Sequence, residues 1–534
     1  MPRLLAALVA VLAPAARADP TYWADVRPVL RKHCTVCHAE RKLGEVEVSA
    51  GLALDKPELI RAGGKGGKVA VVVPGQPDQS LLVTLLTTKD KKRAMPLDAD
   101  PIPAADIATL RRWVELGAPE GVRPKDADPT VAATPGVAAK VRRLPVTFAT
   151  KAVLPKEAQL PGPIDFTLPV GPLPPVAAVA FSPDGTLVAT GTYGRVTVWD
   201  LAKAQPAKVL TNVLGAVNDL RFSPDGTLLA VAGGQPSARG DLRLFAVADW
   251  SLVASLGGHL DTVSAVAWAP DGKRLASASF DKTARLWDVA DAKAPTVLHT
   301  FTGHSDFVYA VAFAPKGDWY ATASKDRTGR LIDAATGKSL FTFSGMTDEV
   351  LAVAVRPDGA QVVTSGLESA LRFWDAKTAE KTKQAGGPGG GTHELAIDPA
   401  GKLLAAAGAD GTVRLVNPPD GAALKVLPAG APVFAVAVDS AAKRVASGSA
   451  DGLVKLWDAA DGRLLVTFWS GADGWLAFTP EGHVSAADGL AARAAWRAGP
   501  RPLTDAKWLA PLAAPGEVGR AAAGAKVDAP AFPR

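Results

Sequence analysis

Two cysteines and a neighbouring histidine are the residues of this chain best suited to covalent chemistry. The stretch HCTVCHAE contains Cys34 and Cys37, the only two cysteines among 534 residues, and His38 follows directly. The spacing C-x-x-C-H allows both thiols to form thioethers with a porphyrin while the imidazole binds its iron. We therefore predict one covalent haem c on Cys34 and Cys37, with His38 as an axial iron ligand.

Two other chemistries also use a C-x-x-C pair. A structural zinc site needs about four protein ligands, but the chain has no further cysteine and its seven histidines are scattered, at positions 33, 38, 259, 299, 304, 393 and 483. A thioredoxin-like redox pair belongs to a βαβ pattern, which the flanking sequence does not show. A disulfide here would close a loop too short to stabilise a large fold. Haem attachment is favoured, with zinc and redox sites as the alternatives.

A methionine is the predicted second axial ligand of the iron. Electron-transfer haems often bind a thioether opposite the histidine, which raises the reduction potential. Apart from the initiator, the chain contains only Met95 and Met346. Met95 lies 57 residues after His38 in KDKKRAMPLDADPIP, where Pro96 stiffens the loop. We predict Met95 as the ligand; the alternatives are an open site beside an exposed Met95, or ligation by His33.

Two amphipathic segments flank these residues and must form the pocket. Residues 22–38 are typical of a short helix that runs into the cysteine motif, and residues 103–117 of a second helix with proline in its first turn and glycine at its end. The apolar faces consist of Val26, Val29 and Leu30 in the first segment and of Ile107, Leu110, Trp113 and Val114 in the second. We expect these faces to pack together and to keep the macrocycle dry.

Residues 22–120 resemble a class I c-type cytochrome domain, most closely the type found in planctomycete proteins. The stretches that carry the resemblance are VRPVLRKHCTVCHAE, AGGKGGKVAVVVPGQPDQSLL, RAMP and DIATLRRWVELGAP. The resemblance implies a small all-α cytochrome c domain with haem c on Cys34 and Cys37. It also implies that His38 and Met95 are the axial ligands.

The first 18 residues are typical of a secretory signal peptide. Arg3 precedes a ten-residue apolar run that is too short to span a bilayer, and Ala16-Arg17-Ala18 matches a cleavage site. We expect an exported mature chain that begins at Asp19, has no membrane span and is periplasmic in a bacterium; an uncleaved membrane anchor is the alternative.

The net charge of +6 comes from interleaved acids and bases without a basic stripe, so nucleic-acid binding is not expected.

A sequence repeat dominates the second half of the chain. Seven segments, VWD, LFA, LWD, LID, FWD, LVN and LWD, end at residues 200, 246, 288, 333, 375, 417 and 458, so the period stays near 43. Most repeats also contain an alternating apolar strand followed by an SPDG-like turn. Such a period predicts an all-β propeller of four-stranded blades. We predict seven blades, with eight as the alternative.

This half resembles WD-repeat propellers over about 300 residues. In that family a histidine, a serine or threonine, an aspartate and a tryptophan tie each blade by hydrogen bonds. The matching residues are His259, Ser277 or Ser279, Asp281 and Trp287 in the third blade, and His304, Ser324 and Asp326 in the fourth, where Ile332 replaces the tryptophan. The departures are Met346 at the histidine position of the fifth blade, and Phe245 and Val416 at the tryptophan positions of the second and sixth. The resemblance implies structural roles for the histidines; a metal or second-cofactor role is the alternative.

The domain boundaries follow from these patterns. We expect a signal peptide at 1–18, the cytochrome c domain at 19–120, a Pro/Ala-rich linker at 121–172, the propeller at 173–470, propeller-closing or accessory strands at 471–514 and a disordered tail at 515–534. In the eight-bladed alternative, the segments 146–150, 164–168 and 474–489 would supply the strands of the eighth blade.

The sequence shows no catalytic constellation, because no nucleophile accompanies a base and no paired acids lie in an evident cleft. We therefore expect an electron carrier and not an enzyme, with a propeller that docks a redox partner protein. The basic residues near Met95 would steer an acidic partner or form an ordinary solvated surface; they are Lys89, Lys91, Lys92 and Arg93. The alternatives are an oxidoreductase whose propeller holds a second cofactor or substrate, and a haem-based sensor scaffold.

Overall fold

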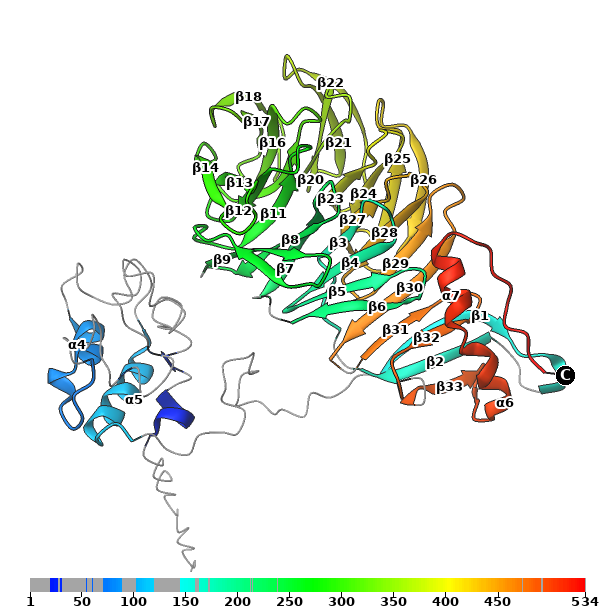
Figure 1. The fold of residues 1–534 in the computed structure, drawn as a ribbon, viewed down its shortest axis with the longest axis horizontal. Helices are drawn as coiled ribbons and strands as arrows, with labels where there is room; N and C mark the ends of the chain where they lie inside the picture. The colour runs from blue at the N-terminus through cyan, green and yellow to red at the C-terminus, as the bar shows by residue number, and fades with distance from the viewer. Residues whose placement is uncertain are drawn as a thin grey trace, which may run out of the picture. The chain divides into compact units, whose positions relative to one another are not determined.

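The computed structural model divides the chain into two compact units, residues 1–133 and 134–534. It describes residues 20–26, 29, 30, 54, 60, 71–88, 102–119, 145–158, 163–170 and 173–533, except 212, 214, 238, 473, 491 and 492. Figure 1 shows the helices and strands of these segments. Within them, no helix has the length and apolar character needed to cross a membrane.

Helices make up the described secondary structure of the N-terminal unit (Figure 1). They are η1 (Tyr22–Val26), η3 (Pro77–Gln79), α4 (Leu81–Thr87) and α5 (Ala104–Glu115). α5 follows Pro103 and ends before Gly117, whose φ of 83° is a left-handed conformation that glycine adopts without strain. The predicted second helix is therefore present, and η1 lies at the start of the first. The prediction of an all-α domain also covers residues outside the described ones and stays a prediction.

The apolar core of this unit contains residues from both predicted faces. Its buried members include Val26, Val29 and Leu30 near η1 and Leu110, Trp113 and Val114 of α5. The rings of Tyr22 and Trp113 lie 6.1 Å apart, and the Tyr22 amide and the Trp113 indole both donate to the Pro119 carbonyl, each at 2.9 Å. Because each buried side chain of this size contributes about 1.5–3 kcal/mol, this core fixes α5 against the chain that leads to the cysteine motif.

The second unit contains a propeller of seven antiparallel sheets (Figure 1). The first four blades are β3 (Ala178–Phe181), β4 (Leu187–Thr192), β5 (Arg195–Asp200) and β6 (Gln205–Leu210); β7 (Ala216–Phe222), β8 (Leu228–Gln235), β9 (Arg239–Ala246) and β10 (Leu252–Ser255); β11 (Val263–Trp268), β12 (Arg274–Ser279), β13 (Ala284–Asp288) and β14 (Thr296–Phe301); and β15 (Val308–Phe313), β16 (Trp319–Ser324), β17 (Gly329–Asp333) and β18 (Ser339–Phe343). The last three are β19 (Val350–Val355), β20 (Gln361–Gly366), β21 (Ala370–Asp375) and β22 (Lys381–Gly386); β23 (Thr392–Ile397), β24 (Leu404–Gly408), β25 (Thr412–Val416) and β26 (Ala423–Pro428); and β27 (Val433–Val438), β28 (Arg444–Ser449), β29 (Val454–Asp458) and β30 (Leu464–Gly471).

The SPDG-like turns connect the first two strands of most blades. In the first blade, Ser182 donates through its hydroxyl to Asp184 at 2.5 Å, and the Gly185 amide donates to the Ser182 carbonyl at 2.8 Å. Gly185 has a φ of 69°, which favours glycine at this position. The turn chemistry therefore fixes where the innermost strand of the blade ends.

The ring closes between the seventh and the first blade. The Val176 amide donates to the Ser449 carbonyl at 3.1 Å, and the Ser440 hydroxyl donates to the Pro183 carbonyl at 2.9 Å. β27 and β3 are therefore neighbours, and no sheet is inserted between them. The alternative of an eight-bladed ring is wrong, because the seven repeats already complete the circle.

The additional strands form layers beside the seventh blade. β31 (Gly474–Phe478) and β32 (Val484–Ala486) extend that blade to six strands, while β1 (Pro145–Val153), β2 (Pro163–Pro169), β33 (Ala495–Ala498) and β34 (Arg501–Pro502) form a separate sheet. Aromatic rings join the two, since Phe478 of β31 lies 5.5 Å from Phe148 of β1 and 5.6 Å from Phe166 of β2. Short helical turns complete this region: η4 (Lys156–Ala158), α6 (Ala506–Leu509) and η6 (Ala510–Leu512).

The prediction of a disordered tail at 515–534 is wrong. α7 (Pro515–Ala522) buries Val518, Ala521 and Ala522 against the propeller core. A side chain on Gly519 would place its Cβ 2.0 Å from the Ala202 carbonyl oxygen, so only glycine permits this close approach. The small residues that resemble a disordered composition are therefore those that let the helix pack against backbone.

Candidate functional site

The predicted haem ligands lie outside the described residues. This holds for Cys34, Cys37, His38 and Met95, for the competing ligand His33, and for the basic residues Lys89, Lys91, Lys92 and Arg93. Their roles therefore stay predictions. The signal peptide at 1–18 and most of the expected linker also lie outside the described residues.

The described residues nearest to the cysteine motif in sequence are apolar and buried. Leu30 precedes Cys34 by four positions and is fully buried, and Leu54 and Ile60 are buried on the chain that follows the motif. The Tyr22 hydroxyl donates to the Leu54 carbonyl at 3.4 Å. Two thiols, an imidazole and a thioether form the donor set of a haem c. A haem also needs apolar surroundings that exclude water, which these buried side chains provide. The residues present therefore fit a haem c.

A buried hydrogen-bond network ties the third blade together. His259 contacts Asp281 Oδ2 through Nδ1 at 2.8 Å and Ser277 Oγ through Nε2 at 2.7 Å, and the Trp287 indole donates to the same hydroxyl at 2.9 Å. Burial lowers the pKa of His259 although Asp281 opposes this shift, so the ring is neutral at pH 7. Burial opposes the ionisation of Asp281, but hydrogen bonds from His259 and Thr283 outweigh it and lower its pKa. The structural role predicted for His259 is confirmed, with Ser277 and not Ser279 as the partner.

The fourth blade repeats this network with one different residue. His304 contacts Asp326 Oδ2 at 2.8 Å and Thr322 Oγ1 at 2.8 Å. The prediction of Ser324 as partner is wrong, because that hydroxyl lies at the end of β16 and donates to the Phe307 carbonyl at 2.8 Å. Thr322 follows His304 by 18 residues, as Ser277 follows His259. Ser324 and Ser279 both follow their histidines by 20 residues, so the spacing alone does not choose between the two pairs.

The fifth blade keeps the tryptophan bond but not the histidine. The Trp374 indole donates to Thr364 Oγ1 at 2.7 Å. Met346 packs against the apolar core shared with the fourth blade, and Glu368 accepts from the Thr347 hydroxyl at 2.8 Å. Met346 is thus a packing residue of the propeller.

The inner wall of the propeller is built from alanine with three exceptions. One layer of the wall is formed by the residue that lies three positions before the proline of each turn. The seventh blade has Ser440 in place of that proline. The residues of this layer are Ala180, Arg221, Ala267, Ala312, Ala354, Ala396 and Ala437. The same face is formed two residues earlier, by Ala178, Asp219, Ala265, Ala310, Ala352, Glu394 and Ala435. We call Asp219, Arg221 and Glu394 the channel triad.

The channel triad joins the second and the sixth blade across the centre of the ring. Arg221 Nη2 donates to Glu394 Oε1 at 2.6 Å and lies 3.3 Å from Asp219 Oδ1. The second oxygen of each acid accepts a backbone amide of the next blade, Val266 for Asp219 and Val436 for Glu394, both at 2.9 Å. Each acid therefore links its own blade to the next and to the single arginine.

Burial shapes the ionisation of the channel triad. It is the largest influence on Glu394 and, with the charge of Asp219, raises the pKa of Glu394 to about 7 in spite of Arg221. Burial also raises the pKa of Asp219. It opposes the charge of Arg221, but the two carboxylates outweigh it and raise the pKa of that guanidinium. The triad therefore carries one surplus negative charge when both acids are ionised.

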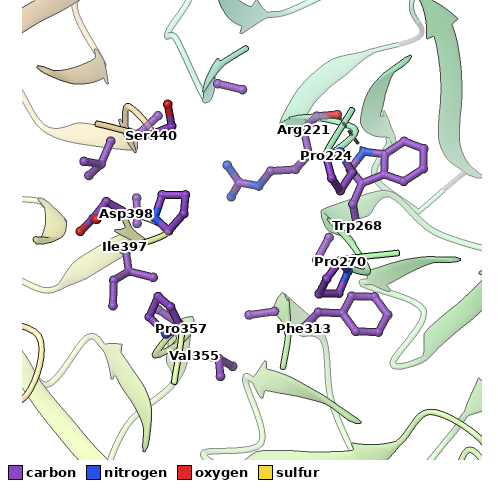
Figure 2. Close-up of a pocket in the computed structure, with 18 of the residues that line it drawn as sticks. Arg221, Pro224, Trp268, Pro270, Phe313, Val355, Pro357, Ile397, Asp398 and Ser440 are labelled. Atoms are coloured by element: carbon purple, nitrogen blue, oxygen red, sulfur yellow. Dashed lines mark hydrogen bonds between the residues drawn. The ribbon is translucent and has the colours of Figure 1, made fainter. Parts of the chain in front are cut away.

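A cavity of about 670 Å³ opens on the side of the SPDG-like turns, and we call it the funnel. All seven blades line it, and its rim carries Pro183, Pro224, Pro270, Pro315, Pro357 and Pro399. Figure 2 shows the guanidinium of Arg221 pointing into this space, while the Trp268 indole turns away and donates to the Arg221 carbonyl at 3.0 Å. A pocket of about 80 Å³, the inner pocket, lies on the other side of Arg221 and is lined by Asp219 and Glu394 among others.

Comparison with known families places both halves of the chain. The model of the planctomycete cytochrome C matches residues 34–98, and the model of the WD domain, G-beta repeat, matches residues 168–200, 205–245, 250–288, 295–333, 337–375, 387–417 and 421–458. The chain is a planctomycete-type cytochrome c domain fused to a WD-repeat propeller. The first match of this fusion protein includes Cys34, Cys37, His38 and Met95, and the second includes the channel triad.

Individual proteins resemble parts of the fusion protein. Transducin beta-like protein 3 of Bos taurus is 37% identical over 128 residues, which are 24% of this chain and 16% of that protein. Protein HIRA of Dictyostelium discoideum is 29% identical over 134 residues, 21% of this chain and 12% of that protein. WD repeat-containing protein VIP3 of Arabidopsis thaliana is 31% identical over 132 residues, 22% of this chain and 40% of that protein. The fusion protein therefore spans less than half the length of these curated relatives.

Sequence reasoning missed the channel triad of the fusion protein. The three residues are scattered over 176 positions, from Asp219 to Glu394, and none belongs to a recognised motif. The available signal was a departure from the repeat, because every equivalent position in the other blades is alanine. An alignment of the seven inner strands would have exposed these charges before the structure did.

Proposed function

We propose that the fusion protein is an exported c-type cytochrome that carries one covalent haem c and transfers electrons, with its propeller as the docking scaffold for a redox partner. One observation carries the proposal: the complete ligand set, Cys34, Cys37, His38 and Met95, lies within the stretch matched by the planctomycete cytochrome C. A bound haem supplies a one-electron Fe(III)/Fe(II) couple.

Different residues of the N-terminal unit would attach the haem, bind its iron and exclude water. Cys34 and Cys37 would attach it, and His38 and Met95 would bind its iron. The core around Leu30 and Trp113 excludes water, and a dry, low-dielectric setting tunes the potential of a metal centre. No residue of the chain needs to take part in bond making after attachment.

The propeller suits protein docking because it is rigid and offers apolar surface at its periphery. The His259 and His304 networks are fully satisfied inside their blades. Large apolar side chains are more than two-fifths exposed on the outermost strands of four blades, namely Leu252 on β10, Val297 and Leu298 on β14, Leu340 on β18, and Leu424 and Val426 on β26. These side chains are available for contact with another protein, which is compatible with a scaffold role.

A cofactor inventory tests the proposal. The full chain is expressed in a bacterium with a haem-ligation system and purified, and its haem is quantified as the pyridine haemochrome beside a metal and flavin analysis. We expect one haem c per chain and no second cofactor. A second redox cofactor in the propeller would contradict the carrier and support an oxidoreductase. Carbon monoxide binding by the reduced native protein would support a sensor.

The two internal methionines provide a matched test of the axial ligand. The Met95→Ala variant should lose the weak Fe(III)–sulfur band at the red edge of the spectrum and gain carbon monoxide binding when reduced, because the iron loses its thioether. The Met346→Ala variant removes a packing residue of the fifth blade and should keep the band. Persistence of the band in Met95→Ala would show that another residue binds the iron.

A further inference from the structure

Arg221 is the one charged residue in its layer of the propeller wall, and part of its guanidinium is unoccupied. Its side chain is 32% exposed, and Figure 2 shows it at the centre of the funnel. Nη2 is bound to Glu394. Within the part of the chain that the structure describes, Nε and Nη1 make no hydrogen bond. The Nε and Nη1 donors of this partly buried guanidinium are therefore free to bind a ligand in the funnel. The cavity is large enough for a small molecule or a chain end.

The rest of the funnel wall is mostly apolar, and its two other charged residues already have partners. Prolines, alanines, Val355 and Ile397 line most of it. Arg356 is paired with Asp358 at 2.7 Å and donates to Gln361. Asp398 accepts the amides of Ala400, Lys402 and Leu403. Arg221 is paired with Glu394 through Nη2, but its Nε and Nη1 still offer charged donors to the funnel.

We propose that the funnel binds a carboxylate carried on an apolar body, with the carboxylate on Arg221 and the apolar body against the proline-rich wall. Guanidinium and carboxylate form strong charge-assisted hydrogen bonds, and two parallel bonds are stronger and more selective than one. Nη1 offers one bond at any pH. A second bond requires Nη2, which Glu394 occupies in the free protein.

Glu394 therefore competes with the ligand, and the competition depends on pH. The other groups that face Glu394 are Asp219 and Arg221 of β7, Tyr309 of β15, His393 beside it on β23, and the Val436 amide of β27. Burial raises the pKa of Tyr309 and lowers that of His393, so both are neutral near pH 7. Because the pKa of Glu394 is about 7, the acid loses its charge as the pH falls through that value and then holds Nη2 less strongly. Affinity for the ligand is then high below pH 7 and declines above it.

Ligand-observed fluorine NMR on the full-length holoprotein tests the site. The probe is 3-(4-fluorophenyl)propionate, and its amide is the control because it keeps the apolar body without the carboxylate. We expect the acid to bind about tenfold more tightly at pH 6 than at pH 8 and the amide to bind at least tenfold more weakly than the acid. Equal binding of acid and amide would overturn the proposal.

Two variants assign the binding to the triad. Asp219→Ala, Arg221→Ala and Glu394→Ala together restore the residue found in the other blades, and this triple variant should fold and lose at least tenfold in affinity. Glu394→Gln should bind with the same affinity at pH 6 and pH 8. Unchanged affinity in the triple variant, or an unchanged pH profile in Glu394→Gln, would each refute the site. Arg356→Ala, a paired arginine of the same wall, should bind like the wild type.

The source of the carboxylate is decided by a second pair of probes. A short peptide that ends in phenylalanine with a free carboxylate, and the same peptide as its amide, are compared with the free acid at pH 6. Tighter binding of the free-ended peptide indicates a polypeptide terminus, and tighter binding of the small acid indicates a metabolite. Neither result depends on haem content, so failure here leaves the electron-transfer proposal intact.

Discussion

The third and fourth blades of the propeller differ from the second and sixth in where their buried polar residues point. In the third and fourth, His259 and His304 lie within the sheet and connect strands of a single blade. In the second and sixth, Phe245 and Val416 take the tryptophan position, and the notable charges, Asp219, Arg221 and Glu394, point to the centre of the ring.

The histidine networks therefore stabilise their blades, whereas the channel triad keeps hydrogen-bond donors available to a ligand. The histidine networks satisfy their donors and acceptors internally, and the His259 and His304 side chains are at most 1% exposed. The channel triad holds one arginine between two acids and leaves donors of Arg221 facing the funnel. A fully satisfied buried network rigidifies a core, whereas an incompletely satisfied one at a cavity is suited to binding.

The largest effect should come from removing only the cation of the channel triad. Arg221→Ala leaves Asp219 and Glu394 buried without their partner, and breaking a buried ion pair in this way costs about 3–5 kcal/mol. The triple alanine variant, which removes all three charges, should lie close to the wild type in its free energy of unfolding. Urea unfolding at pH 7.5 measures both, and a triple variant as unstable as Arg221→Ala would contradict the comparison.

A smaller effect should appear in the pH dependence of stability. The pKa of Glu394 is raised to about 7 in the folded chain, so the folded state holds the proton more tightly than the unfolded state. The contribution is present below the unfolded pKa and is lost as the pH rises through 7. Between pH 5 and pH 8, the wild type should lose about 2–3 kcal/mol relative to Glu394→Gln. Parallel pH profiles of unfolding for the two proteins would show that Glu394 titrates normally.

The smallest effect should come from a single hydroxyl of the fourth blade. Thr322→Val keeps the shape of the side chain but leaves His304 Nε2 without its partner, which costs about 1–2 kcal/mol. Thr300→Val, at an exposed position of β14, is the matched control and should change the free energy of unfolding little. Equal effects of the two substitutions would place Thr322 outside the network.

Periodicity made the architecture of the propeller predictable. The repeat near 43 residues required sheets of four strands, and the alternation in segments such as VSAVAW marked the innermost strands. The blade network of His259, Asp281 and Trp287 followed from its fixed spacing. Local patterns of this kind survive in the sequence because one unit is repeated.

Features that depend on distant segments were not predictable in the same way. Glu394 meets Arg221 only because the ring brings the second and sixth blades face to face, whereas Asp219 and Arg221 lie on the same strand. The composition of α7 predicts disorder because its alanines and glycines gain their burial from the first and seventh blades. The sequence does not separate Ser324 from Thr322, since the register of β16 is invisible without its partners.

The intact mass of the mature protein tests the central claim most directly. The full chain is expressed with a haem-ligation system, purified from the exported fraction and measured under denaturing conditions that release any haem not bound covalently. The account predicts a chain that begins at Asp19 and carries the mass of one haem, reduced to zero haem in a Cys34→Ala, Cys37→Ala variant. A wild-type chain without added mass, or one whose added mass survives in that variant, would contradict it.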